Sequence, residues 1–164
     1  ARNTGLDNMS PGSEFVAFVD ADDWLHPEMY ERMLAAFNED ADIAICDFTM
    51  VSTGGQSYYK AFCTGADARE TISNMLQDGY GGNPWNKVIR KSLIERARLR
   101  FQGYVTGQDL LFIAECFAVC RKAVKVDASL YFYNMMMSEI RNALDEDRWP
   151  EYKKAKLSMV NGEN

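Results

Sequence analysis

Apolar residues recur along this chain with two alternating periods. Mostly apolar segments at residues 14–19 and 42–50 predict buried strands, because a strand covered on both faces has no need of a polar side. Between the two runs the apolar spacing becomes helical, and a helix is expected to begin near Pro27. The side chains expected to pack this helix on the sheet are Met29, Tyr30, Met33, Leu34 and Phe37.

The same patterns continue to the end of the chain. Further helices are expected at 66–77, with Ile72, Met75 and Leu76 buried, at 92–97, and at 109–121, with apolar side chains at 110, 113, 114 and 117. Further strands are expected at 57–63, 123–127 and 129–134, and the glycine-rich segment 78–84 is expected to be a loop. Alternating strands and helices predict an α/β fold.

Three carboxylates follow directly on the first apolar run. Asp20, Asp22 and Asp23 come at the carboxyl end of the strand predicted over 14–19. Crowded carboxylates repel one another unless a cation neutralises them, and hard divalent ions take oxygen ligands of this kind. The pattern therefore favours a metal site, and the alternative is a solvated acidic turn in which Asp23 caps the following helix.

The length and charge of the chain narrow the range of possible functions. A chain of 164 residues suits one domain with a substantial core. Residues 1–82 carry four basic and 14 acidic side chains, which argues against nucleic acid as the main partner. The second half is basic and contains a cluster of cationic side chains. This cluster either binds a diphosphate, a phosphorylated acceptor or a membrane surface, or it is simply a solvated face. The cluster consists of Lys87, Arg90, Lys91, Arg96, Arg98 and Arg100.

The four cysteines show no CxxC pairing and are expected to be reduced thiols of a cytoplasmic protein. Cys116 and Cys120 are four residues apart in a stretch expected to be helical. They are either ligands of a soft metal or small buried residues. His26 is the only histidine, so a zinc site and a histidine-activated nucleophile are both disfavoured. No apolar run approaches the roughly 18 residues of a membrane span.

The segment from Ala1 to Leu25 resembles the middle of a family 2 glycosyltransferase. It contains Ala-Arg-Asn-x-Gly-Leu at residues 1–6, a glycine-containing turn, the apolar strand and then Asp-x-Asp-Asp at residues 20–23, in order and without gaps. The resemblance extends to about residue 141. It implies a GT-A-like mixed sheet flanked by helices, truncated at its N-terminus because the family's opening nucleotide-binding βαβ unit does not precede the Ala-Arg-Asn segment.

The resemblance also assigns the donor side of the site. Asn3, Asp20 and Arg141 are expected to contact a nucleotide-diphosphate sugar, with Asp20 near the ribose and Arg141 near the diphosphate. Asp22 and Asp23 are expected to hold Mg²⁺ or Mn²⁺, which would act as a Lewis acid on the leaving diphosphate.

The general base is expected at Asp109. Residues 106–112 resemble the family's Gly-Glu-Asp-x-x-Phe segment, with Gln108 in place of the usual glutamate. An aspartate at a helix start is held as its anion by the helix dipole, which suits a proton acceptor. The alternative is that Asp109 only caps the helix over 109–121.

The remaining motifs concern the acceptor. Residues 85–90 resemble the family's Trp-Asn-Lys-x-x-Arg stretch, so Trp85, Asn86 and Lys87, together with Gln108, are expected to contact the acceptor. Trp85 is alternatively a core residue. Residues 130–141 resemble Leu-Tyr-x-Tyr-Arg and Ser-x-x-Arg, with Asn134 in place of the first arginine.

Together these features predict an inverting transferase that uses a UDP-sugar and elongates a saccharide or glycolipid in cell-surface polysaccharide synthesis. Residues 1–141 are expected to be part of the catalytic domain and 142–164 a polar tail with a helix near 152–160. The protein is expected in the cytoplasm or at the inner face of the membrane, and an exposed sheet edge predicts a homodimer. One rival is a non-catalytic module of the same fold. The other is a haloacid-dehalogenase-type phosphatase, although Trp24 stands where that motif needs Thr or Val.

Overall fold

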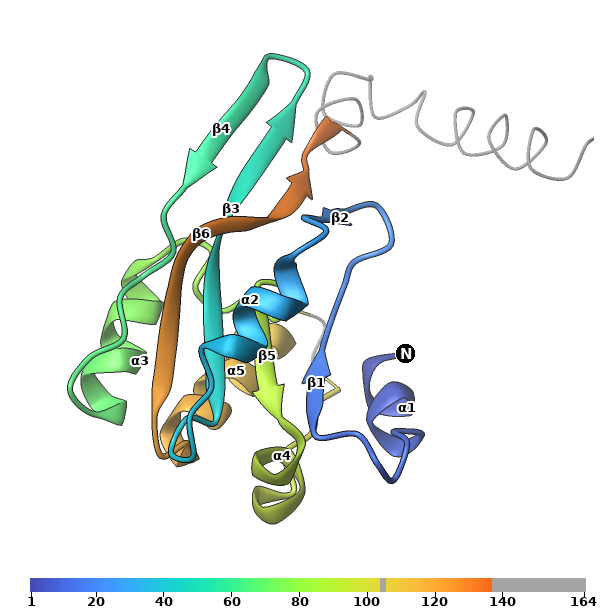
Figure 1. Ribbon diagram of the computed structural model, residues 1–164, viewed down its shortest axis with the longest axis vertical. Helices are drawn as coiled ribbons and strands as arrows, with labels where there is room; N and C mark the ends of the chain where they lie inside the picture. The colour runs from blue at the N-terminus through green and yellow to red at the C-terminus, as the bar shows by residue number, and fades with distance from the viewer. Residues whose placement is uncertain (104–105, 137–164) are drawn as a thin grey trace, which may run out of the picture.

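A computed structural model describes residues 1–103 and 106–136 (Figure 1). The helices are α1 (Arg2–Asp7), α2 (Met29–Ala35), α3 (Ala68–Gln77), α4 (Lys91–Ala97) and α5 (Gln108–Val119). The strands are β1 (Phe15–Ala17), β2 (Trp24–Leu25), β3 (Ile43–Ser52), β4 (Gly55–Tyr59), β5 (Lys87–Arg90) and β6 (Ala123–Asn134). This order confirms the α/β fold with a mixed sheet.

The six strands form one sheet, in which five follow the order β1-β5-β3-β6-β2 and β4 pairs with β3 outside this order. One edge of β3 pairs in parallel with β6, while the other edge is divided between antiparallel partners. Residues 43–45 pair with β5, and residues 48–52 pair with β4, which forms the hairpin that projects beyond the other strands (Figure 1). Since β1 and β3 are both antiparallel to β5, the carboxyl ends of β1, β3 and β6 lie at the same end of the sheet.

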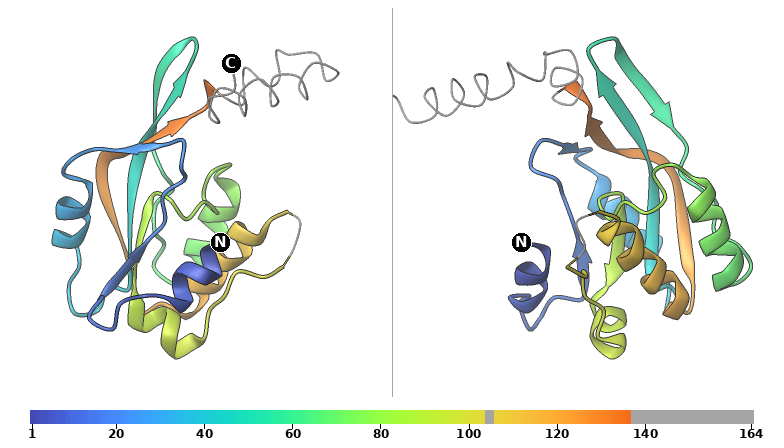
Figure 2. Two further views of the ribbon diagram at one scale, coloured as in Figure 1. Left: turned by 90° about the vertical axis from the view of Figure 1, so that its right-hand side faces the viewer. Right: turned by 180° about the vertical axis from the view of Figure 1, so that it is seen from behind.

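Helices cover both faces of the sheet, with α2 on one face and α3 and α5 on the other (Figure 2). Alternate residues of β3 enter separate cores, as the period of a strand requires. Ile43 and Ile45 pack with the buried side chains of α3, α4 and α5, whereas Ala44 and Cys46 pack with Met29 of α2. Both faces of β3 are therefore buried over residues 43–48.

The final strand corrects one prediction. Residues 123–127 and 129–134 do not form two strands, because β6 continues from Ala123 to Asn134. The pairing with β3 shifts register between Cys46 and Phe48, so extra residues of β6 are accommodated in an irregular stretch. Such a bulge bends a strand without ending it, which explains why the polar Asp127 did not mark a strand end.

Helix faces and boundaries also differ from expectation. The buried residues of α5 are Phe112, Ile113, Cys116 and Phe117, while Leu110 is exposed. Tyr30, Leu34 and Leu76, expected to pack inward, are exposed as well. α1, β2 and β5 were not predicted, because each has seven residues or fewer and carries too little pattern to be recognised.

β1 lies at one edge of the sheet. Pairing of this edge with a second copy stays a prediction. Among the described residues no helix is long and apolar enough to cross a membrane.

A buried carboxylate ties the two parallel strands together at their amino ends. Asp42, just before β3, is fully buried and forms ion pairs with Arg96 at 2.7 Å and Arg121 at 2.8 Å. Burial alone would raise the pKa of Asp42, but hydrogen bonds from Arg121 and Arg96 outweigh burial and hold this pKa well below its usual value.

Replacing Asp42 with Asn should lower the free energy of unfolding at neutral pH by about 2–3 kcal/mol, since a buried network loses its charge. The difference from wild type should persist above pH 4 and shrink as pH falls further, because the unfolded aspartate takes up its proton first. Urea unfolding at several pH values measures this. Asp40→Asn, an exposed change in the preceding loop, is the control, and equal losses in both variants would contradict the assignment.

Candidate functional site

The acidic segment crosses the carboxyl end of the sheet. It leaves β1 at one edge and enters β2 at the opposite edge, where Trp24 pairs with Phe132 of β6 (Figure 1). Within it, the N–H of Asp23 donates to the carbonyl of Asp20 at 3.2 Å, which closes a turn. The carboxylates therefore stand at the carboxyl ends of the strands, where open α/β sheets bind ligands.

Asp23 anchors this turn to β6. Its carboxylate accepts hydrogen bonds from the Tyr131 hydroxyl and from the Asn134 N–H at 2.8 Å. Tyr131 is fully buried, and its hydroxyl also accepts from the N–H of Asp20 at 3.3 Å. Burial raises the pKa of Asp23, although both hydrogen bonds act in the opposite direction. Asp23 does not cap the helix that follows, since α2 has Glu28 at its N-cap.

Asp22 has the opposite surroundings. Its side chain is exposed and its carboxylate has no hydrogen bond or ion pair to any residue in the described ranges. Its backbone is fixed, because the Asn134 side chain donates to the Asp22 carbonyl at 2.9 Å. Asn134, where the resembled family has arginine, thus holds the turn through the backbone of Asp22 and the carboxylate of Asp23. The position of Asp22 is set while its carboxylate remains available.

Arg2 joins Asp20 to Asp109. Its guanidinium forms an ion pair with Asp20 at 3.1 Å and a second, shorter ion pair with Asp109. All three side chains are partly exposed. Asn3 of this motif was predicted as a site residue and Arg2 was not, because only the fold brings Arg2 to Asp20 and Asp109.

Asp109 occupies the first turn of α5 and does not cap it. The N-cap is Gly107, whose φ of 75° suits glycine, and no side chain caps this helix end. The capping alternative is therefore wrong. The Asp109 carboxylate turns instead toward Arg2, on the side of the acidic turn.

Asn3 is engaged with backbone. Its amide donates to the carbonyl of Phe101 at 2.8 Å and its oxygen accepts from the N–H of Phe101 at 3.0 Å. This pair of hydrogen bonds fixes α1 against the segment that precedes α5. Donor contact through Asn3 stays a prediction, and Arg141 lies outside the described residues.

The expected acceptor residues lie deeper than their assigned role requires. Trp85 is 2% exposed and stacks on Tyr131 at 4.5 Å and on Tyr133 at 5.4 Å between ring centroids. This is the core position that the sequence left as the alternative. Asn86 is 2% exposed and Lys87 0%, with the Asn86 side chain donating to the carbonyl of Cys46 at 2.9 Å. Direct acceptor contact by these three residues stays a prediction that their burial does not favour.

Two cavities meet at Gln108. A cavity of about 520 Å³ is lined by Arg2, Asn3 and Asp20 on the side of the acidic turn. A second cavity, of about 480 Å³, is lined by Asp109 and by the loop that carries Gly82. Gln108 lines both, and Asp109 of the second cavity is paired with Arg2 of the first, so the two cavities adjoin beside the Asp109 carboxylate.

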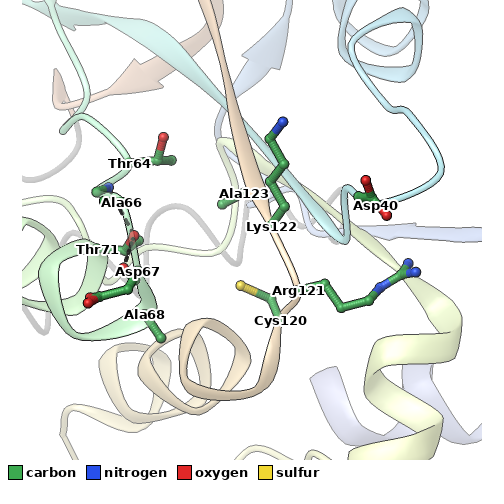
Figure 3. A pocket seen from close by; sticks show the side chains of 11 residues that line it. Asp40, Thr64, Ala66, Asp67, Ala68, Thr71, Cys120, Arg121, Lys122 and Ala123 are labelled. Atoms are coloured by element: carbon green, nitrogen blue, oxygen red, sulfur yellow. Dashed lines mark hydrogen bonds between the residues drawn. The ribbon is translucent and has the colours of Figure 1, made fainter.

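The largest cavity found in the described part of the chain, about 590 Å³, lies elsewhere. It is formed by Lys122 and Ala123 at the start of β6 and by residues 64–68 before and at the start of α3 (Figure 3). Since the acidic turn is bound to the other end of β6, at Asn134, this cavity is remote from the carboxylates.

The side chains can supply part of a metal site. No group of three or more His, Cys, Asp or Glu side chains able to hold a metal is present in residues 1–103 and 106–136. Asp20 is paired with Arg2 and Asp23 is hydrogen-bonded, so Asp22 is the available carboxylate of the turn. This fits Mg²⁺ or Mn²⁺ bound through one or two carboxylates together with substrate phosphates and waters. It does not fit a cage made of protein ligands alone, and Cys116 and Cys120 are free thiols.

A mixed sheet with helices on both faces and an acidic turn across its carboxyl end is the architecture of a GT-A-type glycosyltransferase domain. The sequence matches the family "Glycosyl transferase family 2" over residues 1–125. The chain belongs to this family. This match rules out the dehalogenase-type phosphatase that was considered from the sequence. The boundary at residue 141 between the catalytic domain and a polar tail stays a prediction.

Similar proteins agree with this assignment. The chain is 31% identical to the putative glycosyltransferase EpsH of Bacillus subtilis over 85% of its own length and 42% of that protein. It is 29% identical to the succinoglycan biosynthesis protein ExoW of Rhizobium meliloti, over 79% and 45%. The fold resembles that of TarS from S. aureus, solved also with UDP, with a TM-score of 0.63, 20% identity, and coverage of 90% of this chain and 46% of TarS 1–349. The chain thus spans less than half of each of these proteins.

Tyr131→Phe should lower the free energy of unfolding by about 1–2 kcal/mol, because the half-buried Asp23 carboxylate loses a donor while the ring stack on Trp85 remains. Tyr133→Phe is the matched control, since that hydroxyl makes no hydrogen bond within the described residues. Urea unfolding compares the two variants. Equal effects would show that the Tyr131 hydroxyl does not hold the turn.

Proposed function

We propose that this chain provides the acidic turn and the general base of an enzyme that transfers a sugar from a UDP-sugar to a saccharide or glycolipid acceptor. The observation that carries the proposal is the bridge from Asp20 through Arg2 to Asp109 at the boundary of two cavities. Sugar transfer needs a diphosphate site and a proton acceptor side by side, and this bridge brings together segments 107 residues apart.

The cavity beside Asp20 and Arg2 is the proposed donor site. The structural likeness to TarS, which has been solved with UDP, supports a uridine nucleotide there. Asp22 would hold Mg²⁺ or Mn²⁺, with Asp23 setting the turn and adding a second oxygen only if it gives up a hydrogen bond. A bound cation would neutralise charge on the leaving diphosphate.

Asp109 is the proposed general base. It would take the proton of the acceptor hydroxyl as the acceptor oxygen forms its bond to the anomeric carbon, while the bond from that carbon to the diphosphate breaks. Attack opposite the leaving group inverts the anomeric centre. Before this step Arg2 must release Asp109, and an incoming diphosphate is the natural competitor for a guanidinium.

The cavity beside Asp109 is the proposed acceptor site, with Gln108 at its boundary toward the donor. The name of ExoW, a succinoglycan biosynthesis protein, supports a growing cell-surface glycan as the acceptor. Such an enzyme would work in the cytoplasm or at the inner face of the membrane, where nucleotide sugars are available.

Mn²⁺ titrated into the chain by calorimetry should bind more tightly with UDP present, because phosphate oxygens complete the coordination. Asp22→Asn should weaken binding by roughly tenfold or more, as the available carboxylate is lost. Asp40→Asn, at the opposite end of the sheet, should leave binding unchanged. Binding that survives Asp22→Asn would place the metal elsewhere.

Asp109→Asn in the whole protein should reduce kcat by about 10²–10⁴-fold, since general-base catalysis contributes this much, while the affinity for UDP is kept or rises because Asp109 no longer competes for Arg2. Transfer of radiolabelled sugar from the UDP-sugar measures kcat. Asp7→Asn, an exposed change in α1, serves as the control. Transfer that is absent in the wild type as well would favour the non-catalytic module.

A further inference from the structure

One wall of the cavity beside Asp109 is a closely packed glycine turn. Gly79, Gly82 and Asn83 line the cavity opposite the start of α5. A methyl group at Gly81 would overlap the carbonyl oxygen of Met75, and one at Gly82 would lie 2.6 Å from a methyl carbon of Leu110. The turn thus fits between α3 and α5 only with glycine at both positions, and its placement sets the width of the cavity.

Asp78 fixes the first end of this turn. Its carboxylate accepts hydrogen bonds from the N–H of Tyr80 at 2.8 Å, the N–H of Phe62 at 2.9 Å and the hydroxyl of Tyr59 at 2.9 Å. These contacts hold the start of the turn to the segment that leaves β4.

Lys87 fixes the other end from inside the protein. Its ammonium donates to the carbonyl of Asn83 at 2.6 Å and to the side chain of Asn86 at 2.8 Å. Asn86 in turn donates to the carbonyl of Cys46, so a chain of hydrogen bonds runs from the central strand to the cavity wall. The ammonium also lies 5.7 Å from the centre of the Phe62 ring.

Lys125, which pairs with the same residue of β3 as Lys87 does, shows how a second lysine of the sheet is neutralised. Lys87 of β5 and Lys125 of β6 both pair with Ile45, so they flank one residue of β3. Lys125 forms an ion pair with the buried Asp47 at 3.0 Å. Lys87 is fully buried and forms no ion pair within the described residues. A buried cation without a counter-ion is costly, which calls for a role beyond stability.

We propose that Lys87 is a positioning residue for the acceptor: its ammonium holds the turn at residues 81–84 that forms the wall of the cavity beside Asp109. This rests on the proposed function only for the identity of the cavity's occupant. The anchoring of the turn is a property of the chain itself. Lys87 therefore acts on the acceptor through Asn83 without touching it.

The anchoring depends on the proton of Lys87. Burial lowers the pKa of Lys87 to about 7, so the amine loses its charge near neutral pH. The titratable groups that face it are Cys46 of β3, Cys116 of α5 and Asp78 after α3. Burial raises the pKa of both thiols to about 12, so they stay neutral, and the oxygens of Asp78 are already hydrogen-bonded. Loss of the ammonium weakens its charge-assisted bond to Asn83.

As pH rises, the turn should therefore become less stable while this lysine makes the whole fold more stable. Above pH 7 the unfolded chain keeps the Lys87 proton that the folded chain has lost, so this lysine makes the free energy of unfolding rise with pH. The turn loosens over the same range. A looser turn at higher pH therefore cannot be attributed to global unfolding.

Hydrogen exchange of the peptide that spans the turn tests the proposal. The N–H of Gly81 donates to Asp78 and that of Asn83 to Tyr80, each at 3.1 Å, so both report on the turn. After correction for intrinsic exchange, wild-type protection should fall roughly 5- to 10-fold from about pH 6 to pH 8. Lys87→Gln keeps two N–H donors without a titrating proton, and should give intermediate protection that does not change with pH.

Two controls separate anchoring from general damage to the sheet. Lys125→Gln should behave as wild type in this peptide, although it removes the partner of Asp47. If Lys87→Gln exchanges as wild type at both pH values, or if Lys125→Gln alters the turn equally, the proposal is wrong. Lys87→Met provides the same comparison should the glutamine variant not fold.

In transfer assays of the whole protein, Lys87→Gln should raise KM for the acceptor roughly 5- to 10-fold and leave KM for the UDP-sugar unchanged. A rise in both constants would overturn the positioning role. If the wild type transfers no sugar, the proposed function fails, while hydrogen exchange still decides whether Lys87 anchors the turn.

Discussion

The carboxylate of Asp23 holds the site together. The acidic segment must pass from one edge of the sheet to the other across its carboxyl end, where strand pairing gives it no support. Two hydrogen bonds, from Tyr131 and from the backbone of Asn134, fix it to the end of β6. The exposed carboxylate of Asp22 and the pairing of Asp20 with Arg2 both depend on that attachment, because neighbouring residues of one turn cannot move independently.

The buried charged residues of the sheet differ in whether they are ion-paired. Asp42 at the start of β3 and Asp47 further along it are fully buried, and each is ion-paired with a cation. Lys87 carries a buried charge that has no counter-ion in residues 1–103 and 106–136, and it lies behind the cavity beside Asp109. The paired groups make the scaffold rigid, whereas the unpaired one keeps a pKa near neutrality and can respond to its surroundings.

Sequence patterns predicted the long elements and the place of the acidic turn, because continuous apolar runs and carboxylates at a strand end have direct physical meaning. They did not predict β2 or β5, whose few residues acquire strand geometry only from β6 and β3. Trp85 and Lys87 were assigned to acceptor contact by resemblance, with a core position left open for Trp85, and the structure buries both. Arg2 was overlooked because its partner Asp109 is brought close only by the fold. Asp109 itself was placed correctly in the first turn of a helix, but its direction depends on Arg2.

The acidic turn and the strand that anchors it are far apart in sequence, which affects how the protein folds while it is being translated. The backbone of Asn134 binds Asp23 across 111 residues of sequence, so the turn leaves the ribosome long before the strand that fixes it. Domains fold as units during synthesis, and contacts of this range form late. A nascent chain that ends before β6 would carry every residue of the Asp-x-Asp-Asp motif and still lack the strand that anchors Asp22 and Asp23. The finished strand therefore controls when binding competence first arises.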